Sequence, residues 1–424
     1  MSCCGYCASF DKTLHYVSPA HGGWGVIRVA ALVPESWLLF VAPFACGRHG
    51  ALGGIEAGIK DRVFYVFMDE RDIVSGDYEA LIPDAVGELF DTLGTRPKVL
   101  FVFVSCLDDL LGTDNEAIIE RLSASYPDVA FRSCHMNPVS MDTPNPPGVT
   151  LLDTMYGLLQ KPTVRTTDGR RIVMLAGNNA ALNGDCELSS LLAEKGIRLR
   201  HIGECRSFAE FQELGGSALN LLLRPAAQKA CRSLETRLGI PYLESWVTYD
   251  PDDVARWYRT LEEKLGTGPL GWEAAYEEAQ RAVAQTLLAV GSVPIAIDYQ
   301  AVLLPFSLAR MLLSHGFSVC HIAAKECPAI DAENKRWITE HHPDVQTLNP
   351  LHPDMVRFAL RGTDCICIGF DCSYMTGSTK TVNLMEDEGL FGFAGICTLM
   401  KKIRDAAVSE TDLRTVIREA KLVI

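Results

Sequence analysis

The sequence predicts an α/β chain built on parallel sheets, and three observations point to that class. Short apolar runs rich in Val, Leu and Phe, such as Val99–Val104, are typical of strands buried on both faces. Segments with helical periodicity alternate with these runs, as units of strand, helix and strand require. The chain has 424 residues and 48% hydrophobic content, which is enough for two or three such domains.

The first part of the chain carries a strand, a helix and two further strands. The predicted strands are Val63–Met68, Val99–Val104 and Asp128–Ser133, and the predicted helix is Tyr78–Leu93. Cys134 and His135 follow the last of these strands. The Pro-rich stretch Asn137–Gly148 lacks backbone donors that regular structure needs, so we expect a loop there.

Two further βαβ units follow, one in the middle of the chain and one toward its end. The middle strands are predicted at Arg171–Ala176, Ile197–Ile202 and Ala218–Leu223, with helices at Glu187–Lys195, Ala226–Leu238, Asp252–Leu265 and Gly271–Leu288. The later strands are predicted at Pro294–Ile297, Phe317–Ile322 and Thr363–Gly369, with helices at Ala301–Ser314 and Gly389–Lys401. The turn after Ala176 lacks the Gly-x-Gly-x-x-Gly spacing, so we expect no dinucleotide there.

Cys106 marks the candidate site because it stands at the carboxyl end of a predicted strand. Ligands of open α/β sheets bind beyond such strand ends. After Cys106 the chain turns into Asp114, a good cap for a helix over Asn115–Ser125. A cysteine in this place is either a functional thiol or a small buried hydrophobe, and position alone favours the second.

The charge and the cysteine content restrict the function classes. A formal net charge of −14 argues against nonspecific binding to nucleic acid or to an anionic membrane. The first residues lack the features of a signal peptide, and the apolar segment Val26–Phe44 is broken by Arg28 and Pro34. We therefore expect a cytoplasmic protein that binds no nucleic acid and no membrane. There its 15 cysteines stay reduced, which favours clusters, metals or buried thiols over disulfides.

One group of later cysteines has a spacing of interest. Cys365 and Cys367 alternate on a predicted strand, so their thiols point to the same face. With Cys372 they would form a metal site, but two thiols in an apolar strand more often serve packing. We expect these cysteines to belong to the core.

Three motifs in the first part of the chain carry a resemblance to a known family. Ser18–Gly25 contains His-Gly-x-x-Gly, and Met68–Asp77 contains Asp-Glu-x-Asp-Ile-Val-x-Gly. Lys98–Asp114 contains Ser-Cys-x-x-x-Leu-x-Gly-x-Asp after a strand. In this order the motifs resemble the component 1 family of nitrogenases, which includes the molybdenum-iron protein subunits, cofactor-assembly homologues and dark-operative protochlorophyllide reductase subunits.

The resemblance implies a fold and a set of partners. The fold would be three Rossmann-like domains, nitrogenase component 1-like, which we place at residues 1–165, 166–290 and 291–424. Cys106 would ligate an iron–sulfur cluster, for instance a 4Fe–4S cluster, shared at the interface of a homodimer or with a sister component 1 subunit. The resemblance also implies that electrons would come from a separate ATP-dependent iron protein. This sequence has no Gly-x-x-x-x-Gly-Lys-Ser/Thr loop, so the chain is not expected to be that ATPase.

The family's other cluster ligands are shifted or lost in this chain. Members place a first cysteine upstream of the His-Gly motif, where Cys3, Cys4 or Cys7 would serve; the alternative is a loose terminus with incidental thiols. The second family cysteine closes the motif, but that position is Val26, which cannot bind iron. His21 matches the motif histidine and either orients a loop, which is the favoured role, or faces the cluster.

Cys46 is the candidate replacement for the missing second cysteine. It lies in Ala-Cys-Gly-Arg-His-Gly, where the glycines allow close backbone approach and unusual φ values. Arg48 and His49 would lower the pKa of the thiol, or donate hydrogen bonds to a cluster sulfide or a substrate. Packing within a loop is the alternative role for Cys46.

The ligands of the family's active-site cofactor are missing. By the resemblance, the cysteine position of the middle domain is Leu223, and the histidine position of the third domain is Phe391 or a neighbour. We therefore do not expect reduction of dinitrogen with the usual iron–molybdenum cofactor. The cavity would accept an organic small molecule or another cluster, with Arg224 as an anion clamp unless that side chain is simply solvated or paired.

These interpretations lead to an oxidoreductase subunit that holds an iron–sulfur cluster through Cys46 and Cys106. It would pass low-potential electrons to a small-molecule substrate. Two other hypotheses stay open: an assembly scaffold for an iron–sulfur cofactor, and a cluster-free Rossmann protein that binds a small ligand. The iron content of the purified protein distinguishes the last hypothesis from the first.

Overall fold

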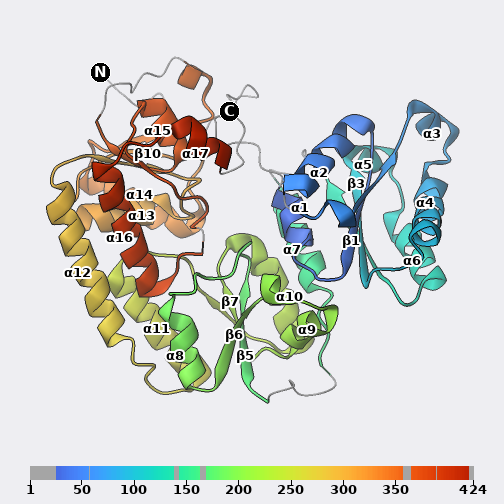
Figure 1. Ribbon diagram of the computed structural model, residues 1–424, viewed down its shortest axis with the longest axis horizontal. Coiled ribbons are helices and arrows are strands. Elements are labelled where there is room, and N and C mark those ends of the chain that lie inside the picture. The colour runs from blue at the N-terminus through green and yellow to red at the C-terminus, as the bar shows by residue number, and fades with distance from the viewer. Residues whose placement is uncertain are drawn as a thin grey trace. The chain divides into compact units, whose positions relative to one another are not determined.

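A computed structural model describes residues 25–56, 58–137, 143–162, 169–356, 364–387 and 389–419 (Figure 1). These residues form three parallel sheets, which we call sheets A, B and C. The chain divides into two compact units. One unit consists of Trp24–Ala181 and Ile197–Glu244 and holds sheets A and B; the other includes Leu182–Gly196 and Ser245–Ile424 and holds sheet C.

Sheet A has four parallel strands in the order β2-β1-β3-β4. They are β1 (Ser36–Ala42), β2 (Val63–Phe67), β3 (Val99–Ser105) and β4 (Ala130–Met136). Every residue of β3 is buried, as its uninterrupted apolar run predicts for an inner parallel strand. The strand β1 corrects the sequence analysis, which treats Val26–Phe44 only as an interrupted apolar region.

The helices around sheet A include two that complete its core. They are α1 (Gly25–Ala30), α2 (Phe44–Glu56), α3 (Glu70–Ser75), α4 (Tyr78–Leu93), α5 (Cys106–Leu111), α6 (Asn115–Ser125) and α7 (Pro147–Tyr156). Apolar side chains of α4 and α6 pack against Leu39, Val102 and Phe131 of the sheet. Helix α2 contacts β1 and β2, and α7 contacts β4.

Two boundaries in this part differ from the prediction. Cys134 and His135 lie inside β4 rather than after it. Pro147 begins α7 instead of belonging to a loop. Proline is tolerated there because the N–H of the first helical residue has no partner within the helix.

Sheet B has the order β6-β5-β7-β8, with all strands parallel. The strands are β5 (Arg171–Ala176), β6 (Ile197–His201), β7 (Leu219–Leu222) and β8 (Tyr242–Glu244), and the helices of this part are α9 (Phe208–Glu213) and α10 (Gln228–Leu238). The chain forms β6 on one side of β5 and then β7 on the other side. The carboxyl ends of β5 and β7 are therefore a topological switch point, the usual place for a ligand in an open sheet.

Sheet C has the order β11-β10-β9-β12-β13, again parallel. Its strands are β9 (Ile295–Asp298), β10 (Val319–Ala323), β11 (Gln346–Leu348), β12 (Ile366–Ile368) and β13 (Thr381–Val382). The helices of this unit are α8 (Glu187–Glu194), α11 (Pro251–Leu265), α12 (Glu273–Val290), α13 (Pro305–Ser314), α14 (Ala332–His341), α15 (Phe370–Thr376), α16 (Gly392–Val408) and α17 (Leu413–Glu419). The two longest, α12 and α16, pack along each other (Figure 1).

The predicted α/β class with parallel sheets is confirmed. One sheet falls within each of the ranges 1–165, 166–290 and 291–424, while the domain boundaries themselves stay a prediction. None of the helices in the described part of the chain is long and apolar enough to cross a membrane.

Candidate functional site

The carboxyl edge of sheet A carries both predicted metal ligands on elements that follow neighbouring strands. Strand β1 runs into α2, which contains Cys46, and β3 runs into α5, which begins at Cys106. The strands pair with Val41 opposite Val104, so both cysteines follow the same edge of the sheet. Both thiols are free and partly exposed. Because neighbouring strands lie about 4.8 Å apart, this edge is a suitable place for a shared ligand.

Cys106 is the first residue of a helix, where the sequence analysis predicts only a turn. The Ser105 hydroxyl accepts a hydrogen bond from the N–H of Leu107 at 3.3 Å. The Asp108 carboxylate accepts one from the N–H of Ser105 at 2.9 Å. These bonds form a capping box, and the Ser-x-x-Asp spacing is the signal that could have predicted it.

Asp108 is a buried carboxyl group that the sequence analysis missed as part of the site. The hydroxyl of Tyr78, at the start of α4, donates a hydrogen bond to it. Burial raises the pKa of Tyr78 well above its usual range and also raises the pKa of Asp108. Through its two hydrogen bonds, Asp108 connects the start of α4 and the end of β3 to the first turn of α5. These bonds fix the position of the backbone at Cys106.

A second polar group lies at the same edge. One Asp109 carboxylate oxygen lies 3.1 Å from Nδ1 of His135, and the other accepts a hydrogen bond from the Asn137 amide at 2.5 Å. A carboxylate that orients an imidazole in this way prepares the ring to hold and deliver a proton. From the sequence, His135 is predicted only to follow a strand and Asp109 has no predicted role, because their contact joins separate elements.

Cys46 lies in α2 rather than in a loop. A Cβ on the adjacent Gly47 would come within 2.9 Å of the Phe67 ring, so glycine allows the helix to approach β2 closely. Gly47 itself keeps the backbone of the helix and has no positive φ, so glycine serves close approach here and not an unusual backbone conformation. Arg48 and His49 lie on the same helix, and their side chains are outside the described part.

The remaining predicted cluster residues, Cys3, Cys4, Cys7 and His21, lie outside the described residues. Among the residues that the structure describes, no group of three or more His, Cys, Asp or Glu side chains is arranged to hold a metal ion. Cys46 and Cys106 therefore fit an iron–sulfur cluster only as part of a larger ligand set. The N-terminal cysteines or a second chain would have to complete it.

Arg224 stands at the switch point of sheet B. It follows β7, while Gly177 follows β5. A Cβ on Gly177 would lie 3.3 Å from the backbone nitrogen of Arg224 and 2.8 Å from the Cβ of Ala227. Gly177 also has a φ of 99°, so both its conformation and its surroundings require glycine. The close approach brings half-buried Arg224 to the place where an open sheet binds its ligand.

The two positions expected to correspond to the family's cofactor ligands are buried and apolar. Leu223 is buried directly after β7. Phe391 is buried before α16, and its ring centroid lies 4.9 Å from that of Trp257 in an edge contact. Neither Leu223 nor Phe391 has a side-chain atom that binds a metal.

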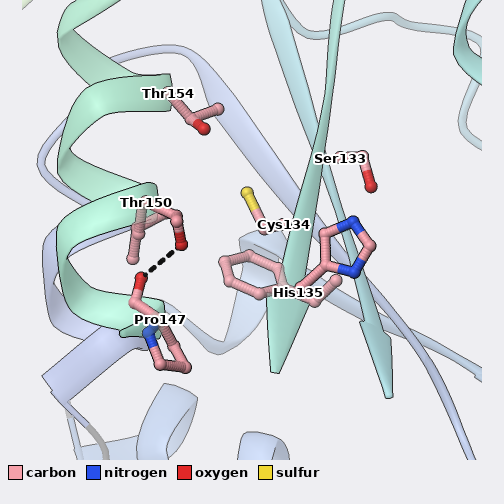
Figure 2. A pocket seen from close by; sticks show the side chains of 8 residues that line it. Ser133, Cys134, His135, Pro147, Thr150 and Thr154 are labelled. Carbon is pink, nitrogen blue, oxygen red and sulfur yellow. Dashed lines mark hydrogen bonds between the residues drawn. The ribbon is translucent and has the colours of Figure 1, made fainter. Parts of the chain in front are cut away.

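A small pocket of about 80 Å³ lies between β4 and α7 (Figure 2). It is lined by Phe103, Ser133, Cys134, His135, Pro147, Thr150, Leu151 and Thr154. Figure 2 shows the sulfur of Cys134 on the side of β4 that faces the helix. Burial raises the pKa of this thiol well above its usual range, so the thiol stays protonated and adds no ligand to the site.

Comparison with known proteins identifies the family. A family model described as nitrogenase component 1 type oxidoreductase matches residues 23–406. The solved structure titled "Nitrogenase Cp1 at pH 6.5" is 13% identical with a TM-score of 0.68, and the match covers 94% of each chain. The structure titled "Nitrogenase Cp1 at pH 5" is 15% identical with a TM-score of 0.62, covering 94% of this chain and 89% of that one. No curated protein sequence matches. The chain therefore belongs to the nitrogenase component 1 type oxidoreductases.

Proposed function

We propose that the chain is a component 1-like subunit that binds an iron–sulfur cluster through Cys46 and Cys106 and passes low-potential electrons to a small-molecule substrate. One observation carries this proposal. Cys46 and Cys106 are both partly exposed and follow the paired strands β1 and β3, in a chain of the nitrogenase component 1 type family. Thiolates are the usual ligands of such clusters, and a strand edge holds them in fixed directions.

The ligand number favours a cluster shared between two chains. Two copies would supply four cysteines, the number that a 4Fe–4S cluster uses. The surface supports such pairing, because Phe44 in α2 is 65% exposed and Leu110 in α5 is 80% exposed. Contiguous exposed apolar side chains mark surfaces that bind another protein, and both of these residues lie on helices that follow the same edge of sheet A. A sister component 1 subunit would use the same surface, and Cys4 or Cys7 would add further ligands.

The bound cluster would supply one-electron transfer at low potential. By the family resemblance, a separate ATP-dependent iron protein would be the electron donor; this sequence has no Gly-x-x-x-x-Gly-Lys-Ser/Thr loop, so the chain would not be that ATPase itself. The chain's own side chains would supply protons: His135 is oriented by Asp109, and 45% of its side chain is exposed. Arg48, His49 and His21 would add hydrogen-bond donors around the cluster.

The substrate would be an organic small molecule rather than dinitrogen. By the family resemblance, Leu223 takes the place of the cysteine that the usual cofactor needs, and Phe391 or a neighbour takes the place of the histidine. Arg224 at the switch point of sheet B would bind an anionic group of the substrate, because a guanidinium group pairs well with carboxylate or phosphate.

The same two apolar positions favour a second candidate function, assembly of an iron–sulfur cofactor. A scaffold would hold a cofactor precursor and turn over no substrate. Electron transfer to an added substrate in the presence of a partner iron protein separates the two functions. Turnover supports the reductase, and transfer of the bound cluster to an acceptor protein without turnover supports the scaffold.

Iron and acid-labile sulfide in anaerobically purified protein test the cluster. We expect stoichiometric iron and sulfide that are lost in Cys46→Ala and in Cys106→Ala. The matched control Cys327→Ala, which removes another partly exposed thiol, should keep both. Visible and low-temperature EPR spectra of the same samples report the cluster directly. A folded, dimeric and colourless protein would contradict the proposal and favour the cluster-free ligand-binding hypothesis.

A further inference from the structure

Four cysteines gather around the core of sheet C, and none belongs to the proposed cluster site. Cys365 and Cys367 are fully buried at β12, and Cys372 is buried beside them in α15. Cys320 of β10 is partly buried against the same group. The expected burial of Cys365, Cys367 and Cys372 in the core is confirmed, but their contacts show more than packing.

The sulfur atoms of Cys365 and Cys367 lie 3.5 Å apart, close to van der Waals contact. Residues two apart on a strand have Cα atoms about 6.6 Å apart, which is near the upper limit for a disulfide. Cys320 packs against the same group and donates a hydrogen bond to the carbonyl of Ile295 at 3.4 Å, but β9 lies between the strand of Cys320 and the strand of Cys365 and Cys367. Two strand spacings place those Cα atoms about 9.6 Å apart, too far for a disulfide. The geometry therefore selects Cys367 as the partner of Cys365.

The surroundings favour the reactive form of Cys365. Interaction with the neighbouring thiols of Cys320 and Cys367 lowers the pKa of Cys365. His321 lies near enough to interact electrostatically with Cys365, and burial lowers the pKa of its imidazole. The imidazole is buried, and its Nδ1 atom has no hydrogen-bond partner in the described part of the chain. A ring that stays neutral keeps a lone pair on this nitrogen, which relays a proton between a neighbouring thiol and a departing hydroxide.

We propose that Cys365 and Cys367 form a reversible dithiol–disulfide pair that hydrogen peroxide oxidises. The Cys365 thiolate attacks one peroxide oxygen and becomes a sulfenic acid, and the hydroxide released takes the proton that Cys365 had lost. The Cys367 sulfur then attacks the Cys365 sulfur, and the departing hydroxide takes the Cys367 proton by way of His321. Two thiols and one peroxide become one disulfide and two waters.

Two features make this pair suitable for reversible oxidation. Partly exposed Cys320 packs against the same buried group and gives a molecule as small as peroxide a short approach from solvent. A bridge across two strand residues is strained, and strained disulfides are readily reduced by thiols. The Cys367 sulfur also lies 3.3 Å from the Thr376 hydroxyl, so bridging disturbs a contact that holds α15.

Peptide mapping of the full chain after exposure to hydrogen peroxide tests the proposal. Cleavage after Arg361 and Lys380 leaves residues 362–380, which contain Cys365, Cys367 and Cys372. We expect this peptide to lose two hydrogen masses, with Cys372 the one cysteine in it that still reacts with iodoacetamide. Dithiothreitol should restore the reaction of the other two.

Variants separate a redox pair from mere packing. In Cys367→Ser, peroxide should leave a sulfenic acid on Cys365 that dimedone traps, and in Cys365→Ser it should leave Cys367 unmodified. The matched control Cys231→Ser removes another fully buried cysteine, in α10, and should not change bridge formation. Circular dichroism checks that each variant folds. Wild-type protein in which both thiols stay alkylatable, or in which the bridge includes Cys320 or Cys372, would overturn the proposal.

Discussion

At the residue scale, His201 shows how buried hydrogen bonds couple stability to pH. Its Nδ1 accepts a hydrogen bond from the N–H of Gly203 at 3.1 Å, so Nε2 carries the proton and donates to the carbonyl of Asn178 at 3.0 Å. Burial lowers the pKa of His201 from its ordinary value of 6.5. Below about pH 6.5 the unfolded chain therefore binds a proton that the folded chain does not bind.

From this we predict that the free energy of unfolding falls as pH drops below about 6.5, by at most about 1.4 kcal/mol per pH unit for His201. His201→Asn keeps a side-chain acceptor for Gly203 and cannot titrate, so it should flatten this dependence. Urea denaturation at several pH values measures both proteins. Any slope that remains in the variant belongs to groups such as His321, whose pKa burial also lowers. An identical slope in the variant would show that His201 is not the group responsible.

At the residue scale, the sequence predicts one part of the candidate site and does not predict another. Cys106 was found because an apolar strand ends directly before it, which is a local pattern. The bond between Tyr78 and Asp108 joins residues 30 positions apart, and it exists because α4 packs beside the end of β3. No periodicity or spacing contains that information, so only the fold reveals it.

At the scale of elements, the N-terminus of α16 is capped by a carboxylate that belongs to another helix. Glu187 of α8 accepts hydrogen bonds from the N–H groups of Phe393 at 2.7 Å and Ala394 at 3.0 Å, and from the Tyr258 hydroxyl at 2.8 Å. The first N–H groups of a helix have no partner within it and carry partial positive charge. The carboxylate therefore caps α16 and holds α8 against it.

We predict that Glu187→Ala lowers the free energy of unfolding by about 1–3 kcal/mol, because it leaves buried N–H groups without a partner. The matched control Glu194→Ala changes an exposed carboxylate on the same helix and should cost less than about 0.5 kcal/mol. Chemical denaturation gives both values. Hydrogen exchange should speed up at Phe393 and Ala394 in the first variant alone. Equal effects of the two substitutions would rule out the capping role.

Element boundaries show which patterns carry information. The prediction for α4, Tyr78–Leu93, agrees with the structure, because a helix of this length repeats its apolar face several times. Helix α5 has six residues, too few for a period to show, so its local signals are the capping box at its start and Gly112 after its end. Strand β1 is not predicted from the sequence because it lies in the apolar region Val26–Phe44, which also contains α1. The pattern of this region therefore does not distinguish a strand from a helix.

At the scale of the whole molecule, the proposed function would require two chains to pair if Cys46 and Cys106 were the ligands that each chain supplies. One chain offers Cys46 and Cys106 in its described part, and a 4Fe–4S cluster uses four thiolates. If two chains complete the cluster, loss of pairing and loss of iron must occur together. Leu110 provides a way to test this, because it is largely exposed and stands four residues after Cys106.

We predict that Leu110→Asp abolishes the dimer and its iron together, because an interface would bury the new charge without a partner. The free energy of unfolding of the Leu110→Asp monomer should stay unchanged, since the substituted side chain is exposed to water in the monomer. The matched control Val408→Asp, on an equally exposed position of α16, should keep dimer and iron. Anaerobic native mass spectrometry should find two chains with about four iron atoms in the wild type. An iron-loaded monomer would instead place the whole ligand set in one chain, with Cys4 and Cys7 completing it.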